Sequence, residues 1–395
     1  MSQPQLFEGA ALADGLTPEL RKPVSVLIAD GAVTGLFDGS APARARTGAR
    51  VIDASGATIV PSMVDCHSHL TLPGGAQWVA RGGDPTAELI DAAERNAAAL
   101  TAAGIRWVRD VGSPRRPDTP DGRERALALS LRDLWRGRPD YPYVRAAGTW
   151  VTRGGSLPPG LSVEVQDADG LLAASLAQLD DGADLVKLYL DGPDADVAPW
   201  SAGEVRRVVD AVHARGATVA AHGTGLANCR LAAEAAVDTL EHGFTIDADV
   251  ARLLVANRVT VVSTLSVLQS WQGFASTTTI DRFTTRAGRQ RVAERLETAQ
   301  QSVRMAHAAG VAIAAGSDFG GGSVRAGHLA WEVEGLVRAG LEPWEALGAA
   351  TWRGGEVLRD PRAGRLAVGG PAHFTLVHGD PLSDPSALWR VWRVV

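Results

Sequence analysis

The sequence predicts an α/β protein in which a (β/α)8 barrel carries a small β-sandwich built from both ends of the chain. Between residues 58 and 363, eight apolar, β-branched runs alternate with helical stretches rich in Ala, Leu and Arg. Such alternation favours a parallel sheet, and eight units over this length suit a closed barrel. Short alternating β segments lie before residue 57 and after residue 364, which predicts the second, smaller domain.

The barrel elements are expected where apolar runs and helical stretches follow one another. Each strand is a short run bounded by polar or turn residues. The expected strands are residues 59–66, 105–111, 143–148, 185–190, 218–222, 239–242, 259–264 and 311–317. The expected helices include residues 85–103, 170–182, 202–215, 229–236, 291–309, 329–339 and 343–351.

The two ends of the chain are expected to pair with each other. Residues 24–29 alternate in character and lead into Asp30 and Gly31, a strong hairpin signal. Residues 364–367 and 372–378 are expected to return as strands. The predicted domains are a composite β-sandwich of residues 1–57 and 364–395 and a barrel of residues 58–363.

Composition narrows the class of protein. A net charge of −6 gives no electrostatic argument for nucleic acid or an anionic membrane. No apolar run approaches the roughly 20 residues that span a bilayer, and the first residues lack a secretory signal. The only cysteines, Cys66 and Cys229, make a disulfide framework implausible. We expect a cytoplasmic enzyme with a small-molecule substrate, and any oligomer is expected to be a homo-oligomer.

Residues with metal-binding or acid–base chemistry end five of the expected strands. His67 and His69 close the first strand, where residues two apart point to the same face. The ends of strands four, five, six and eight carry Lys187, His222, His242 and Asp318. A barrel gathers these ends at one rim, and imidazole is a good ligand for Zn²⁺. Singly, the histidines could be core or capping residues and the aspartate could cap a turn; together they predict a metal site.

On these motifs the chain resembles the amidohydrolase superfamily over nearly its whole length. The similarity includes the turn at 109–112 (Arg-Asp-Val-Gly) and the returning segment 364–382. The segments 221–225 (Ala-His-Gly-Thr-Gly), 240–243 (Leu-Glu-His-Gly) and 315–318 (Ala-Gly-Ser-Asp) are most similar to the imidazolonepropionase-like and prolidase-like branch.

The resemblance implies a hydrolase with two metal ions. His67, His69 and Asp318 would hold one ion and His222 and His242 the other, while Lys187, carboxylated by CO2, would bridge them. Zn²⁺ is expected, with Mn²⁺, Fe²⁺ or Co²⁺ as alternatives. A hydroxide between ions about 3.5–4 Å apart would attack an amide carbonyl. Asp318 would take up its proton and pass it to the leaving nitrogen.

Lys187 is informative because this chain hardly uses lysine. Of its 39 basic residues only Lys22 and Lys187 are lysine. A strand-end lysine can simply pair with an acid or extend its amine towards solvent, but arginine fills generic cationic positions elsewhere in this chain. A neutral amine can add to CO2, whereas a guanidinium stays protonated. The lysine therefore supports the carboxylated, binuclear interpretation.

Substrate contacts are expected from the loops that follow strands one, three and seven, residues 72–84, 150–158 and 266–286. Tyr189 shares a strand face with Lys187 and is expected to donate to a tetrahedral oxyanion. These side chains could instead pack loops onto the barrel or, for His328, begin a helix. The candidate contacts are Tyr189, Trp78, Trp150, Arg153, Trp271 and His328.

The leading hypothesis is hydrolysis of the C–N bond of a dipeptide, an N-acyl amide or an aryl amide. A cyclic amide of the lactam or imidazolone type is the nearest alternative. A mononuclear deaminase usually lacks the lysine and uses a Glu or His to assist the water; Glu241 is expected on the strand face opposite His242 and fits that role poorly. A non-catalytic scaffold usually loses ligands, and none is missing.

Overall fold

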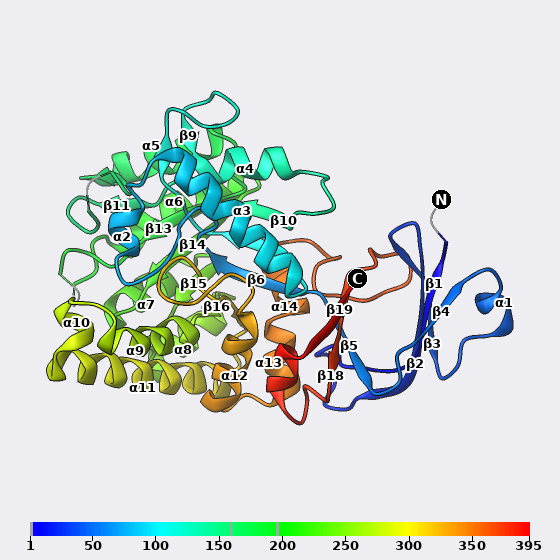
Figure 1. Ribbon diagram of the computed structural model, residues 1–395. Coiled ribbons are helices and arrows are strands. Elements are labelled where there is room, and N and C mark those ends of the chain that lie inside the picture. The colour runs from blue at the N-terminus through cyan, green and yellow to red at the C-terminus, as the bar shows by residue number, and fades with distance from the viewer. Residues whose placement is uncertain (1–2, 159, 195–196) are drawn as a thin grey trace.

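The computed structural model describes residues 3–158, 160–194 and 197–395 (Figure 1). Two regions are evident. One is a body of parallel strands surrounded by helices, and the other is a sheet at one side of that body in which the two ends of the chain meet. The strands over residues 63–68 and 105–110 are buried along their length, as expected when both faces of a parallel sheet are covered.

The terminal sheet has seven strands in the order β19-β18-β5-β1-β2-β3, with β4 paired to β1. Its first hairpin is as predicted, because Ala29 pairs with Ala32 across Asp30 and Gly31, both with positive φ. The chain ends meet where β18 runs antiparallel to β5. The strands are β1 (Gln5–Leu12), β2 (Arg21–Ala29), β3 (Ala32–Asp38), β4 (Arg50–Asp53), β5 (Ala57–Pro61), β18 (Phe374–His378) and β19 (Val391–Val394).

The body contains two parallel sheets. One has the order β10-β7-β6, from Tyr143–Ala146, Ile105–Asp110 and Met63–Ser68. The other has the order β12-β11-β13-β14-β15-β16-β17, from Val163–Val165, Val151–Arg153, Leu185–Tyr189, Thr218–Gly223, Thr239–His242, Thr260–Ser263 and Ile313–Ala315. Isolated parallel bridges join the two sheets at both ends, between Ala147 and Leu185 and between Ser68 and Phe319. Each of the eight predicted strands overlaps one of these strands.

Helices follow most strands of the body. Several begin with residues that commonly cap helices. For example, α6 starts with a capping box, in which the side chains of Ser201 and Glu204 each accept a hydrogen bond from the other residue's backbone amide. The longer helices are α3 (Thr86–Ala102), α4 (Leu127–Trp135), α5 (Ala168–Asp180), α6 (Ala202–Ala214), α7 (Leu226–Glu234), α8 (Ala248–Ala256), α9 (Leu265–Gln272), α11 (Arg286–Ala308) and α12 (Leu329–Ala339). The shorter ones are α1 (Ala43–Arg46), α2 (Trp78–Arg81), α10 (Asp281–Thr284), α13 (Pro343–Ala349) and α14 (Trp352–Val357).

Three local predictions were wrong. The expected strand 59–66 is divided: β5 pairs within the terminal sheet and β6 pairs with β7. The division falls at Pro61 and Ser62, a break signal within the run that the prediction did not use. Residues 364–367 form no strand, and Gly364 instead lies against the backbone of Thr351. The expected loop 266–286 is largely helical. Within the described part of the chain, no helix combines the length and apolar character needed to cross a bilayer.

Candidate metal centre

The centre begins with two histidines at the end of β6. Nδ1 of His67 lies 2.7 Å from Oε2 of Glu241, and Nδ1 of His69 lies 2.9 Å from the carbonyl oxygen of Gly112. A carbonyl oxygen only accepts hydrogen bonds, so Nδ1 of His69 carries the proton. The Glu241 carboxylate likewise only accepts hydrogen bonds, so Nδ1 of His67 also carries the proton. Both imidazoles therefore keep the Nε2 lone pair for a metal.

Asp318 completes a compact group from the loop after β17. Its Oδ1 lies 3.6 Å from Nε2 of His67 and 3.4 Å from Nε2 of His69, and one ligand atom from each residue fits within 4.8 Å of the others. The Asp318 amide donates to the His67 carbonyl at 2.8 Å. A Cβ at Gly316 would lie 2.4 Å from the His67 Cβ, so glycine permits this close approach of the two strands.

His222 on β14 and His242 on β15 extend the group. Nε2 of His222 lies 3.0 Å from Oδ2 of Asp191, which leaves Nδ1 for a ligand. Nδ1 of His242 lies 2.8 Å from Oγ1 of Thr264, which leaves Nε2. The His242 ring centroid is 4.6 Å from that of His67 and 4.5 Å from that of His222. The four histidines thus form a continuous row.

Lys187 on β13 lies in the same cavity with its amine buried. Its side chain is 1% exposed, and Nζ has no hydrogen-bond partner among the described residues. Burial lowers the pKa of Lys187 to about 8, with a further contribution from Arg109. A buried amine without a partner is costly, and a lowered pKa provides the neutral form that can add to CO2.

Burial favours the neutral form of His67, His222 and His242, which metal ligation requires. Burial, together with Lys187, lowers the pKa of His67 well below its usual value. Burial and the neighbouring His222 do the same for His242, and burial also lowers the pKa of His222. The site therefore presents lone pairs rather than N–H groups.

An outer network holds His67 and was missed from the sequence. Glu241 is fully buried and contacts both Nδ1 of His67 and the Arg109 guanidinium, each at 2.7 Å. Burial raises the pKa of Glu241, but Arg109 and Lys187 bring it below its usual value. The expectation that Glu241 faces away from the site was wrong. His242 has a φ of 72°, so strict alternation no longer applies where this strand ends.

Asp191 was also missed, although a signal for it exists. Its carboxylate binds His222, the amide and hydroxyl of Thr224, and the Asn228 amide. Burial acts to raise the pKa of Asp191, yet His222 and Thr224 hold it below its usual range. It stands four residues after Lys187, on the face that alternation gives to Lys187 and Tyr189.

One cavity of about 280 Å³ collects these residues. Its lining includes all six predicted ligands and four predicted substrate contacts, Tyr189, Trp78, Trp150 and Trp271. The Tyr189 ring stacks on His222 with centroids 4.0 Å apart. Burial raises the pKa of Tyr189, so its hydroxyl stays protonated.

Two predicted substrate contacts lie elsewhere. Arg153 places its guanidinium 4.7 Å from the Trp200 ring centroid, and His328 packs edge-on against Trp389 at 5.1 Å. Among the described residues, neither contributes to the cavity lining. The lining also includes Phe244, Arg282 and Arg295, which sequence reasoning did not single out, since two of them lie on helices whose orientation depends on packing.

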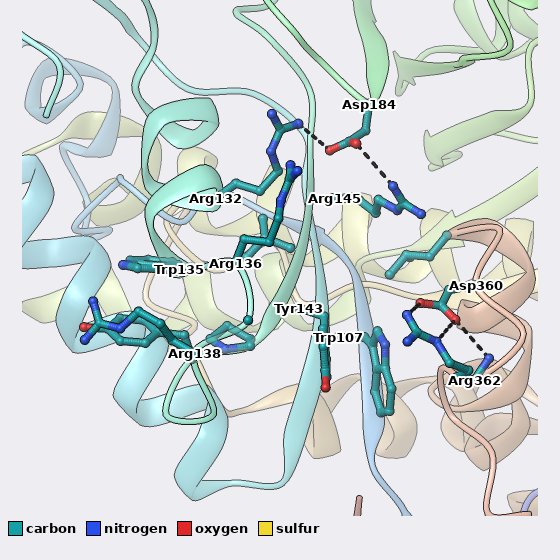
Figure 2. Close-up of a pocket in the computed structure, with 15 residues that line it drawn as sticks. Trp107, Arg132, Trp135, Arg136, Arg138, Tyr143, Arg145, Asp184, Asp360 and Arg362 are labelled. Carbon is teal, nitrogen blue, oxygen red and sulfur yellow. Dashed lines mark hydrogen bonds and ion pairs between the residues drawn. The ribbon is translucent and has the colours of Figure 1, made fainter. Parts of the chain in front are cut away.

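A larger cavity of about 530 Å³ lies at the other ends of the strands (Figure 2). Its described lining contains no histidine. Arg132 and Arg145 both reach Asp184, at 2.7 and 3.3 Å, and Arg362 reaches Asp360 at 2.7 Å. Because Arg132, Arg145 and Arg362 are already paired and the lining includes no histidine among the described residues, this cavity offers no comparable metal-binding chemistry.

Comparison with known proteins agrees with this geometry. The family model described as "Amidohydrolase family" matches residues 58–395. An uncharacterized protein of Mycobacterium tuberculosis is 31% identical over 307 residues, which cover 75% of this chain and 73% of that protein. Imidazolonepropionase of Salinispora tropica is 28% identical over 400 residues, covering 95% and 89%. The crystal structure of a Xaa-Pro dipeptidase with bound methionine is 25% identical, with a TM-score of 0.83 and coverage of 99% and 98%.

Proposed function

Because the chain belongs to the amidohydrolase family, we propose that the cavity around His67, His69 and Asp318 is the active site of a metal-dependent amide hydrolase. Members of this family are hydrolases that act on C–N bonds, and this chain is an enzyme of that class. The observation that carries the proposal is the buried amine of Lys187. It lies in one cavity with four histidines and an aspartate.

The donor set fits two divalent ions. His67, His69 and Asp318 would hold one ion, and His222 and His242 the other. Lys187 would bridge them after its neutral amine adds to CO2. This would explain why Nζ of Lys187 is buried without a hydrogen-bond partner among the described residues. Zn²⁺ suits imidazole ligands, as do Mn²⁺, Fe²⁺ and Co²⁺ to differing degrees. When bound, such ions polarise a carbonyl and lower the pKa of water.

The chain's own residues would move the protons. Asp318 lies between the two histidines of β6 and is 7% exposed, so it can accept a proton from the attacking water and give it to the leaving nitrogen. The hydroxyl of Tyr189 stays protonated and can donate to the oxyanion. Glu241 would not assist the water, because His67 and Arg109 already occupy its carboxylate.

The substrate is proposed to be a linear amide such as a dipeptide, an N-acyl amide or an aryl amide. Apolar rings of Trp78, Trp150 and Trp271 in the lining support this class, and a structural neighbour is a Xaa-Pro dipeptidase. The likeness to imidazolonepropionase over 95% of this chain favours a cyclic amide as the second candidate.

We also infer that the two parallel sheets are arcs of one (β/α)8 barrel. The bridges Ala147–Leu185 and Ser68–Phe319 support this arrangement, as do backbone hydrogen bonds from Asp318 to His67 and from Asp184 to Ala146. The metal centre would then stand at the C-terminal rim, where such barrels place their chemistry.

Metal content and hydrolysis of an amide library test the proposal. Protein loaded with Zn²⁺ and bicarbonate is expected to hold about two ions per chain and to hydrolyse members of the library. Lys187→Ala is expected to lose metal and more activity than the 10–100-fold typical of an outer-shell change. Lys22→Ala, at the chain's other lysine, is the matched control. One ion per chain, with Lys187→Ala keeping that metal and full activity, would contradict the binuclear proposal.

A further inference from the structure

Two arginines stand at the mouth of the metal-centre cavity, and aromatic rings fix both of them. The Arg282 guanidinium of α10 lies 4.8 Å from the Trp271 ring centroid and 4.5 Å from that of Phe283. The Arg295 guanidinium of α11 lies 5.3 Å from the Phe244 ring centroid. Both arginines line the cavity. Cation–π contacts of this kind hold a guanidinium in place without neutralising it.

Each guanidinium is one aromatic ring away from the proposed metal ligands. Phe244, under Arg295, has its ring centroid 5.3 Å from that of His242. Trp271, under Arg282, directs Nε1 to the carbonyl of Gly321 at 3.4 Å, in the turn that Asp318 begins. The two arginines therefore approach the centre from α10 and α11 and face the same space.

Neither arginine has a carboxylate partner among the described residues. In the larger cavity most arginines have carboxylate partners, as Arg132 has Asp184 and Arg362 has Asp360, while Arg138 lies against the Tyr141 ring. Burial lowers the pKa of Arg282, and the positive charge of Arg295 lowers it further. Two like charges held close together without a counter-ion favour the binding of an anion.

We propose that Arg282 and Arg295 bind a substrate carboxylate, so that the enzyme acts on N-acylated α-amino acids, including dipeptides with a free carboxyl end. In such a molecule one extended residue, about 3.3–3.6 Å long, separates the scissile amide from the carboxylate. The apolar surface of Trp78, Trp150 and Leu161 would take the side chain. This inference rests on the proposed function.

Binding to chelator-treated protein tests the arginine pair without turnover. The probes are N-acetyl-L-phenylalanine and N-acetylphenethylamine, which differ only in the carboxylate. Wild-type protein is expected to bind the anionic probe about 10-fold or more tightly than the neutral one in calorimetry, since hydrogen bonds to charged groups are the stronger class. Arg282→Gln and Arg295→Gln should each remove most of this preference and leave affinity for the neutral probe unchanged.

Two further variants separate recognition from folding. Arg291→Gln removes the same charge from an exposed position of α11 outside the cavity lining and should keep the wild-type preference. Arg295→Lys retains charge but not the planar fork and should keep part of it. Equal affinity of wild-type protein for both probes overturns the inference. So does an equal loss of both affinities in Arg282→Gln and Arg295→Gln.

Kinetics of the metal-loaded enzyme distinguishes this failure from failure of the proposed function. Hydrolysis of both probes without preference would keep the amide hydrolase and remove the carboxylate site. Carboxylate-dependent binding with no hydrolysis under any metal loading would keep the site and remove the proposed function. If the proposed function and the carboxylate site are both correct, kcat/KM for the anionic probe falls in Arg282→Gln and Arg295→Gln, mainly through a higher KM.

Discussion

The two cavities at opposite ends of the parallel strands differ in how their polar groups are satisfied. The larger, of about 530 Å³, is lined by arginines that already contact Asp184 and Asp360. The smaller, of about 280 Å³, contains a group of histidines and a lysine amine without a hydrogen-bond partner in the described part of the chain. One ring nitrogen of each histidine is hydrogen-bonded to the surrounding protein, and the other faces the cavity without such a bond to the described residues. The Lys187 amine, for which the described residues supply no hydrogen-bond partner, identifies the candidate site better than cavity volume does.

The difference has a physical basis. Buried polar groups are nearly always hydrogen-bonded, so an exception needs an explanation such as an absent ion or a catalytic role. At the starts of the strands, ion pairs satisfy Arg132, Arg145 and Arg362. Nε1 of Trp107 has no partner among the described residues there, but it is a donor only and cannot bind a metal. At their ends, Glu241, Asp191 and Thr264 hold the histidines from behind and leave their free nitrogens facing the cavity.

Asp318→Asn gives the largest expected effect at the small cavity. The amide cannot carry the proton from water to the leaving nitrogen, so kcat should fall about 10²–10⁴-fold. Steady-state assays with the best library substrate measure this, and metal analysis shows whether an ion is lost as well. Asp169→Asn, an exposed helix position, is the control and should keep full activity. An active Asp318→Asn enzyme would remove Asp318 from the proposed mechanism.

Glu241→Gln tests whether the outer network matters for the small cavity. The amide would no longer offer an anionic acceptor to His67 and would leave the Arg109 guanidinium without its carboxylate partner. Loss of such a partner typically costs 10–100-fold in metal affinity or activity, and an unpaired buried charge also destabilises the fold. Metal titration and thermal unfolding measure both effects. Wild-type metal affinity in this variant would contradict the assigned role.

Lys187 gives the small cavity a pH dependence that the large one lacks. Its pKa is lowered to about 8, so the neutral amine fraction rises as pH increases towards 8 and levels off above it. At a constant concentration of dissolved CO2, uptake of labelled CO2 by metal-free protein should therefore increase more than 10-fold between about pH 6 and 8, as measured by carbon NMR of the carbamate. Lys187→Ala should show no such signal. Uptake that falls as pH rises would contradict the prediction.

The sequence predicted the inner residues of the site because the strand rules are local. His67, His69, Lys187, His222, His242 and Asp318 all line one cavity, as expected for strand ends that meet at one edge. Glu241 could not be placed, because the positive φ of His242 breaks the alternation on which its position was predicted. Arg282 and Arg295 could not be placed either, since packing on Trp271 and Phe244 decides where they point.

The fold shows the same division between local and long-range information. The Asp30-Gly31 turn was predictable because a two-residue hairpin with positive φ at both positions has a specific sequence signal. The division of residues 59–66 between two sheets was missed although Pro61 and Ser62 stand where it falls. Which sheet each half joins depends on its distant partner, β18 or β7, and no local pattern gives that.

Arg362→Gln is expected to give the smallest effect and so completes the comparison of the two cavities. It removes the ion pair with Asp360, in which Arg362 is 59% exposed. A pair with one exposed partner is worth about 0–1 kcal/mol. Asp360 is buried, but it keeps the backbone amide of residue 362 as a hydrogen-bond donor. Thermal unfolding should shift slightly and kcat/KM should not change. A large loss of kcat would mean that the larger cavity communicates with the metal centre, and unpaired polar groups would then no longer distinguish the two sites.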